Sequence, residues 1–302
     1  MAPDMSHQTP DPNDEHGSVY DGLLGTDTSQ WAFGTLPEIQ HGEDPLAGVD
    51  TTVPAGLDAA ELAAYCLSLG DDALVMSHRL SEWCSNAPDL EEDIALANIA
   101  LDLLGQARLL LARAAAADPS VVPGLPEGSP VPVEDALAFF REAVDFRNVR
   151  MVEVENGDFA HTIVRLLLFA TVRLSAFERL AQAEHVFGED PVLAAIAAKG
   201  VKELTYHRDY AGRWFLTLAQ GTDESRRRLL DGLAALWPLY DDLRMAYDAG
   251  PDVDVVLDQV FAVSAVERPD VAPMAGRGHT EALSRMLAEM QVVARAHPKG
   301  LW

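Results

Sequence analysis

The stretch LEEDIALANIALDLLGQAR, residues 90–108, decides the fold that we expect for this chain. Three acidic side chains, residues 91–93, would fill a first helical turn, where the helix dipole favours negative charge. Apolar residues then recur at the three- and four-residue spacing of a helix face, from Ile94 to Leu111. Because Asn86-Ala87-Pro88-Asp89 breaks the chain just before, the pattern predicts a long helix that begins near residue 90.

The neighbouring segments predict how this helix is connected. On its N-terminal side, Asp58 can cap a helix that reaches about Trp83 along an apolar stripe. On its C-terminal side, prolines forbid regular helix and leave only a short helical piece near 136–145. These prolines are Pro119, Pro123, Pro126, Pro130 and Pro132. The sequence therefore predicts a helical pair followed by a long connection.

Two more long helices follow the connection. The first is expected from about residue 156 or 158 to 185, and the second from the cap and first-turn proline at Asp190-Pro191 to about Leu218. Shorter helical patterns cover 224–248, 253–267 and 280–296. A long crossover in the middle of four helices is the connection of a ferritin-like bundle. We therefore predict an all-α fold, a ferritin-like four-helix bundle over residues 57–302 with a long crossover between its second and third helices and additional C-terminal helices.

Charge and composition limit the partners of the chain. Only 22 Lys and Arg face 48 Asp and Glu, a formal net charge of −26 that disfavours nucleic acid and anionic membrane surfaces. Residues 1–56 carry ten acidic and no basic side chains and show no sustained period, so we expect an acidic, flexible N-terminal extension. The longest strongly apolar stretch, Leu166–Val172, is flanked by Arg165 and Arg173. The sequence thus predicts no membrane span, and we expect a cytoplasmic protein.

A di-iron site is the chemistry to test first in such a bundle. It needs one Glu from each of two helices and a Glu-x-x-His pair from each of the other two. Glu203 is followed by Tyr206 at the position where a histidine should stand, and His207 comes one residue later. Asp102 is followed by Gly105, and no histidine occurs between residues 90 and 117. The sequence therefore predicts neither a bound metal nor a catalytic residue in this chain.

The residues at these positions would instead line a vestigial metal-site pocket. Its candidate members are Asp72, Asn98, Asp102, Gly105, Asp158, His161, Lys202, Glu203, Tyr206 and His207. The plainer interpretation is that Asp102 and Glu203 are acids paired with Arg108, Lys202 or Arg208, or solvated on a helix flank. A further hypothesis places the Lys202 cation near the bundle centre, where a relative would hold its metal.

Several stretches resemble one protein family. Residues 61–108, with LAAYCLSLGDDALVMSHRLSEWC and LEEDIALANIALDLLGQAR, are similar to the structural C subunits of bacterial phenylacetyl-CoA 1,2-epoxidases, which are multicomponent monooxygenases. DFRNVRMVEVENGDFAHTIVR from Asp145, IAAKGVKELTYHRDY from Ile196 and HTEALSRMLAEMQ from His279 extend the likeness over most of 57–302. Residues 1–56 lie outside it.

This resemblance implies a ferritin-like, non-catalytic subunit that pairs with a catalytic A subunit, whose di-iron centre epoxidises the ring of phenylacetyl-CoA with dioxygen. It also implies a small B subunit and a reductase that carries flavin and an iron–sulfur cluster and takes electrons from NADPH. A large contact between helices would stabilise the A subunit, and we expect it to use apolar faces of the helices at 58–83 and from residue 90. Self-association is a further possibility.

Two other functions stay open on the sequence. The chain could be an active di-iron oxygenase that uses Glu203, His207, Asp102, Asp158, His161 and Asp72 in an unusual arrangement. It could also be a helical scaffold protein outside aromatic metabolism.

Overall fold

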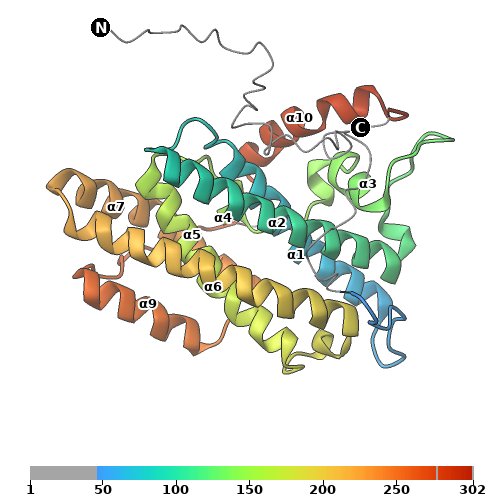
Figure 1. Ribbon diagram of the computed structural model, residues 1–302, viewed down its shortest axis with the longest axis horizontal. Coiled ribbons are helices and arrows are strands. Elements are labelled where there is room, and N and C mark those ends of the chain that lie inside the picture. The colour runs from blue at the N-terminus through green and yellow to red at the C-terminus, as the bar shows by residue number, and fades with distance from the viewer. Residues whose placement is uncertain (1–45, 277, 301–302) are drawn as a thin grey trace, which may run out of the picture. The chain divides into compact units, whose positions relative to one another are not determined.

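The computed structural model describes residues 46–276 and 278–300, and every regular element within those ranges is a helix (Figure 1). This confirms the all-α prediction. Four of the helices are long, and they form two pairs joined by an extended connection.

The first pair consists of α1 (Ala59–Ser81) and α2 (Leu90–Ala117), which pack along each other. Each begins at an aspartate cap: Asp58 accepts hydrogen bonds from the backbone N–H groups of Ala60 and Glu61, and Asp89 accepts one from Glu92. Both starts were predicted from the sequence, because a cap is a local interaction within one turn.

The second pair consists of α5 (Phe159–Ala181) and α6 (Pro191–Gln220). Asp158 caps α5 through the N–H of His161, and Asp190 caps α6 through the N–H of Leu193. A short 3₁₀ turn, η4 (Val186–Glu189), joins them. Helix α6 also packs against α2, so the two pairs lie side by side (Figure 1).

The connection between the pairs contains only short helices. These are η2 (Pro119–Val121), α3 (Val133–Phe139), η3 (Ala143–Asp145) and α4 (Arg150–Glu153). The single piece expected over 136–145 is divided into α3 and η3, and side chains of the C-terminal helix α10 (Glu281–Ala296) bind carbonyls at the end of α3 and just after it. Gln291 Nε2 donates to the carbonyls of Ala138 and Arg141 at 3.0 and 3.1 Å.

Between α6 and α10 the chain forms α7 (Asp223–Leu236), η5 (Trp237–Leu239), α8 (Tyr240–Ala246) and α9 (Pro251–Ser264). The helical pattern expected over 224–248 is present as α7, η5 and α8, with an interruption at Trp237-Pro238. A proline inside a helix removes a hydrogen bond and clashes with the preceding turn, which explains the break.

Helices α2 and α5 differ in how far they are buried. Both are long and apolar enough to cross a membrane by length and composition alone. In α5, 89% of the most apolar window is buried inside the protein, so α5 is the core helix of the bundle. In α2 the corresponding share is 44%, which leaves much of an apolar helix uncovered within the described structure.

Residues 46–56 belong to the stretch for which an extension is expected. Within them, Leu46, Val49 and Val53 pack against the core, and the Thr51 carbonyl accepts a hydrogen bond of 2.7 Å from Arg113. Residues 1–45 lie outside the described residues, so the boundary at residue 57 stays a prediction.

Asp190, the cap of α6, also forms a buried ion pair, so its removal should lower the stability of the protein. Asp190 is fully buried and binds Arg113, which is itself 2% exposed at its side chain. Asp190→Ala removes the cap and leaves this guanidinium unpaired, so we expect the free energy of unfolding in urea to fall by about 3–5 kcal/mol. The control is Asp231→Ala, which removes an ion pair with Arg227. Because the Asp231 side chain is 65% exposed, this variant should keep the urea midpoint of wild type. Equal losses in the two variants would contradict this account.

Candidate functional site

A buried arginine lies between the helix pairs. Arg173 on α5 is fully buried, and its Nε donates to Oε1 of Gln106 on α2 at 3.1 Å. Its Nη1 donates to the Leu69 carbonyl of α1 at 3.1 Å and to the Tyr247 hydroxyl at 2.7 Å. Its Nη2 has no hydrogen-bond partner in the described structure, and the guanidinium carbon lies 4.4 Å from the centre of the Phe177 ring. This guanidinium therefore connects α1, α2 and α5 to the segment after α8.

Two of the expected pocket acids are joined through this arginine. On one side, Gln106 Nε2 donates to Glu203 Oε2 at 2.9 Å, and Lys199 also pairs with Glu203. On the other side, the Tyr247 hydroxyl donates to Asp72 Oδ2 at 2.8 Å. We call the five residues Asp72, Gln106, Arg173, Glu203 and Tyr247 the Arg173 network. It carries one hydrogen-bonded chain from α6 through α2 and α5 to α1.

The electrostatics of Asp72 follow from its position at the end of the network. The side chain is 2% exposed and also accepts the backbone N–H of Val149 at 2.8 Å. Burial raises the pKa of Asp72 to about 7, because the charged carboxylate loses its hydration; the two hydrogen bonds and Arg173 act in the opposite direction. Burial likewise raises the pKa of Tyr247 well above its usual value. Burial therefore brings the titration of this carboxyl close to neutral pH.

A second pair of candidates meets nearer the surface. His207 Nε2 lies 3.0 Å from Asp102 Oδ2; the His207 side chain is fully buried, whereas that of Asp102 is 38% exposed. Nδ1 of His207 has no hydrogen-bond partner in the part of the chain that the structure describes. The pair links α6 to α2, and the Asp102 carboxylate stays partly exposed.

The other candidates lie apart from these two groups. Asp158 caps α5, and His161 packs against α7, where an added Cβ on Gly232 would lie 2.9 Å from the His161 Cα.

Three more candidates, Asn98, Lys202 and Tyr206, have exposed side chains, and a Cβ added to Gly105 would meet no atom within 4 Å. Lys202 is thus not the cation at the centre of the helices, whereas Arg173 is buried between them.

The expected pairing of the acids also needs correction. Arg108 pairs with Glu134 and Arg208 with Asp209. Asp102 and Glu203 instead take His207 and Lys199.

The donor set does not fit a di-iron centre. Across residues 46–276 and 278–300, no three His, Cys, Asp or Glu side chains gather closely enough to hold a metal ion. The oxygens of Asp72 and Glu203 already accept hydrogen bonds, and the guanidinium between them would repel a ferrous ion. The six residues of the oxygenase alternative are not brought together.

Three members of the network were missed by sequence reasoning, namely Gln106, Arg173 and Tyr247. Arg173 gave a signal, since it ends the apolar run 166–172 inside a helix whose other faces are also apolar. An arginine in such a helix is buried and needs buried acceptors. Gln106 and Tyr247 gave none, because their partners are 67 and 74 residues away in the chain.

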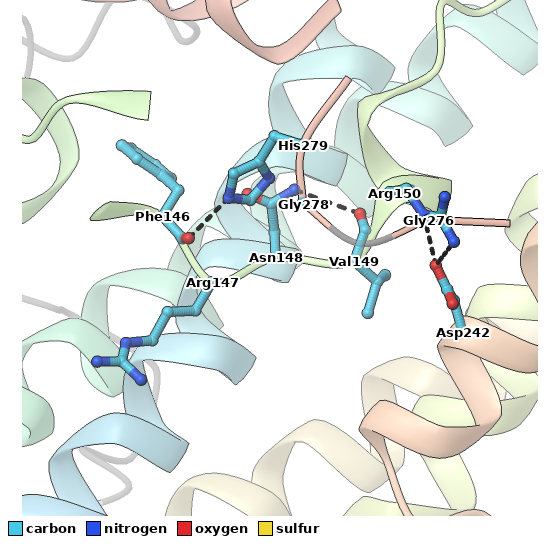
Figure 2. A pocket seen from close by; sticks show the side chains of 9 residues that line it. All are labelled: Phe146, Arg147, Asn148, Val149, Arg150, Asp242, Gly276, Gly278 and His279. Carbon is cyan, nitrogen blue, oxygen red and sulfur yellow. Dashed lines mark hydrogen bonds and ion pairs between the residues drawn. The ribbon is translucent and has the colours of Figure 1, made fainter. Parts of the chain in front are cut away.

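A cavity of about 300 Å³ lies where the crossover meets the C-terminal part of the chain (Figure 2). Two of the basic side chains that line it, Arg150 and His279, already have partners. Arg150 donates to Asp242 Oδ2 at 2.6 Å and to the Ala275 carbonyl at 3.1 Å. Nε2 of His279 lies 2.8 Å from the Phe146 carbonyl, and Nδ1 pairs with Glu153, which raises the pKa of His279. We therefore interpret this cavity as a structural junction that fastens the crossover.

Comparisons with known proteins agree with the resemblance noted in the sequence. A family model described as phenylacetic acid catabolic protein matches residues 49–255, which include all four long helices and the crossover. The chain is also 38% identical over 266 residues to a protein of Escherichia coli (strain K12) that is named as the C subunit of 1,2-phenylacetyl-CoA epoxidase. That alignment covers 80% of this chain and 99% of the relative.

The raised pKa of Asp72 predicts a pH dependence of stability. The folded protein binds a proton at Asp72 more tightly than the unfolded chain, whose carboxyl titrates near 3.8, so this group disfavours folding increasingly as the pH rises from about 4 to 7. Asp72→Asn keeps an acceptor for Val149 and cannot ionise. Urea unfolding across this pH range should therefore show wild type losing stability relative to Asp72→Asn as the pH rises. A constant difference between the two proteins would contradict the assignment.

Proposed function

The chain belongs to the phenylacetic acid catabolic protein family, and we propose that it is the C subunit of a phenylacetyl-CoA 1,2-epoxidase. In this role it has no catalytic centre of its own and stabilises the di-iron catalytic subunit during aerobic phenylacetate degradation. The observation that carries the proposal is the likeness, over 99% of its length, to a relative named as the C subunit of that epoxidase. A protein named as one subunit has partner subunits, so this chain acts within a complex.

The arrangement of the helices supports a ferritin-like four-helix bundle. Helices α1 and α2 form one pair, α5 and α6 form the other, and the only connection between the pairs within the described residues is the long crossover at 118–158. A bundle with one long crossover is the ferritin-like topology.

The Arg173 network supports a subunit without its own iron. In di-iron relatives of this topology, carboxylates and histidines of the four helices bind the metals. Here Asp72 accepts hydrogen bonds from Tyr247 and the Val149 N–H, and Glu203 accepts them from Gln106 and Lys199, which leaves few free oxygens for a cation. The Arg173 guanidinium lies between the two acids and is bonded to Gln106 and Tyr247. In this proposal the di-iron centre belongs to the A subunit, while flavin, iron–sulfur cluster and NADPH belong to the reductase. A small B subunit completes this cytoplasmic complex.

The first alternative, an active di-iron oxygenase, and the second, a scaffold protein outside aromatic metabolism, make different predictions. An oxygenase would bind iron when isolated. A scaffold outside aromatic metabolism would be encoded without oxygenase or CoA-ligase genes nearby.

Iron content together with co-purification tests the proposal. Produced alone in iron-supplemented cells, the chain should contain well below one iron per polypeptide by mass spectrometry of the metal. Co-expressed with the catalytic subunit, it should co-purify as a complex with about two irons, and both subunits should become more soluble. About two irons on the isolated chain, or no change in the solubility of either subunit, would count against the proposal.

Glu203→Ala gives an independent test within the assembled complex. Glu203 would be a ligand in the oxygenase alternative, whereas here it only accepts hydrogen bonds from Gln106 and Lys199. We expect epoxidation of phenylacetyl-CoA by the reconstituted complex to stay within about twofold of wild type, because no reacting group is removed. A loss of several orders of magnitude, with the complex still assembled, would favour the oxygenase alternative.

A further inference from the structure

The outer side of α2 is an exposed apolar stripe. Leu90, Ile94, Leu101 and Leu104 are 68%, 54%, 63% and 45% exposed. Their spacing of four, seven and three residues places them on one face of the helix, over about 21 Å of its length. The inward side of the same helix is also apolar, with Leu96, Ile99 and Leu103 fully buried. A helix that is apolar on both sides is normally covered on both.

Helix α6 extends this stripe into a surface of two helices. Trp214 Nε1 donates to Glu92 on α2 at 2.8 Å, and the Tyr210 hydroxyl also bonds to Glu92. The Tyr206 ring, 53% exposed, lies beside that of Tyr210 with ring centres 6.3 Å apart. Asp102 pairs with His207 of α6 and lies on the side of the α2 stripe that faces α6. We call the surface formed by Leu90, Ile94, Asn98, Leu101, Asp102, Leu104, Gly105 and Tyr206 the α2–α6 face.

The composition of the face differs from that of the whole chain. Between residues 94 and 104, the most exposed positions of α2 are occupied by the uncharged residues Ile94, Asn98, Leu101 and Leu104. Asp102, which pairs with His207, is the one charged residue in that segment of a chain whose net charge is −26. Charged residues are depleted in this way at the cores of protein interfaces. A Cβ added to Gly105 would meet no atom within 4 Å, so this glycine is not required by packing inside the described structure. Its lack of a side chain instead lets the backbone of another helix approach closely.

We propose that the α2–α6 face binds the catalytic subunit, through an apolar helix of that subunit that crosses α2 at Gly105. This inference rests on the proposed function, which supplies the partner. Asp102 at the centre accepts a hydrogen bond from a donor side chain of the partner. The sequence-based expectation that α1 also contributes is not supported, because its large apolar side chains are buried within this chain.

Charge distinguishes this occupant from two others. In a symmetric dimer the face would meet its own copy, so Asp102 would approach Asp102 without a counter-charge. An anionic bilayer would meet a protein of strongly negative net charge. A partner helix with apolar side chains and one donor satisfies both the stripe and the carboxylate.

Two substitutions on the face, each with a matched control, test the proposal. Gly105→Trp places a large side chain where the partner would approach, and Leu101→Lys places a charge in the stripe. The controls are Gly212→Trp and Val292→Lys. Gly212 is a helical glycine of α6 whose added Cβ would also meet no atom within 4 Å, about 200° round the helix from Tyr210. Val292 is a valine of α10 that is 58% exposed. Circular dichroism and melting temperature confirm that each variant folds.

The readout is the Kd for the purified catalytic subunit, measured by calorimetry or surface plasmon resonance. We expect both face variants to weaken binding at least about tenfold and both controls to bind like wild type. If wild type binds and the folded face variants bind equally well, the proposed face is wrong while the proposed function stands. If wild type itself does not bind, the proposed function fails. Two other results would also overturn the proposed face, provided that the face variants still bind the catalytic subunit. In the first, wild type forms a homodimer and the face variants do not. In the second, wild type adsorbs to phosphatidylcholine vesicles and the face variants do not.

Discussion

Among the buried charges of the described residues, the guanidinium of Arg173 is the one whose hydrogen-bond network involves all four long helices. An arginine that is fully removed from water must be paired or hydrogen-bonded, because desolvation of the ion is costly. Its hydrogen-bond partners come from α1, α2 and the segment after α8. One of them, Gln106 of α2, also donates to Glu203 and so extends the network to α6. The relative placement of all four long helices is therefore tied to the geometry of this group. The same network gives Asp72 and Glu203 a structural role, because each is linked to Arg173 by a hydrogen-bonded side chain, although the bundle lacks a fitting set of metal ligands.

Local signals in the sequence predicted most of the fold. The caps at Asp58, Asp89, Asp158 and Asp190 act within one turn, and each marks the observed start of a long helix. The break at Trp237-Pro238 has an equally local cause, because Pro238 cannot continue the hydrogen bonds of the preceding helix. The candidate site was less predictable. Which cation lies inside depends on how α5 is rotated within the assembled bundle, so Arg173, not Lys202, could only be identified once the helices were placed.

Helix α2 contributes to both the interior of the protein and the proposed subunit interface. Its inner side packs in the core and supplies Gln106 to the Arg173 network, whereas its outer side exposes Leu101 and Leu104. The His207–Asp102 pair reaches from the buried side of α6 to that outer side. A partner that covers α2 would therefore stabilise both proteins through a surface whose geometry the interior network fixes. Such mutual stabilisation is a sufficient reason for a subunit to persist without a metal.

Anomalous X-ray diffraction at the iron edge, from crystals of the isolated chain soaked anaerobically with ferrous iron, tests the central claim most directly. We expect no anomalous peak between α1, α2, α5 and α6, and electron density for the Arg173 side chain in contact with Gln106, the Leu69 carbonyl and Tyr247. Two iron peaks bridged by Asp72, Asp102 or Glu203, with the guanidinium displaced from the interior, would contradict the account.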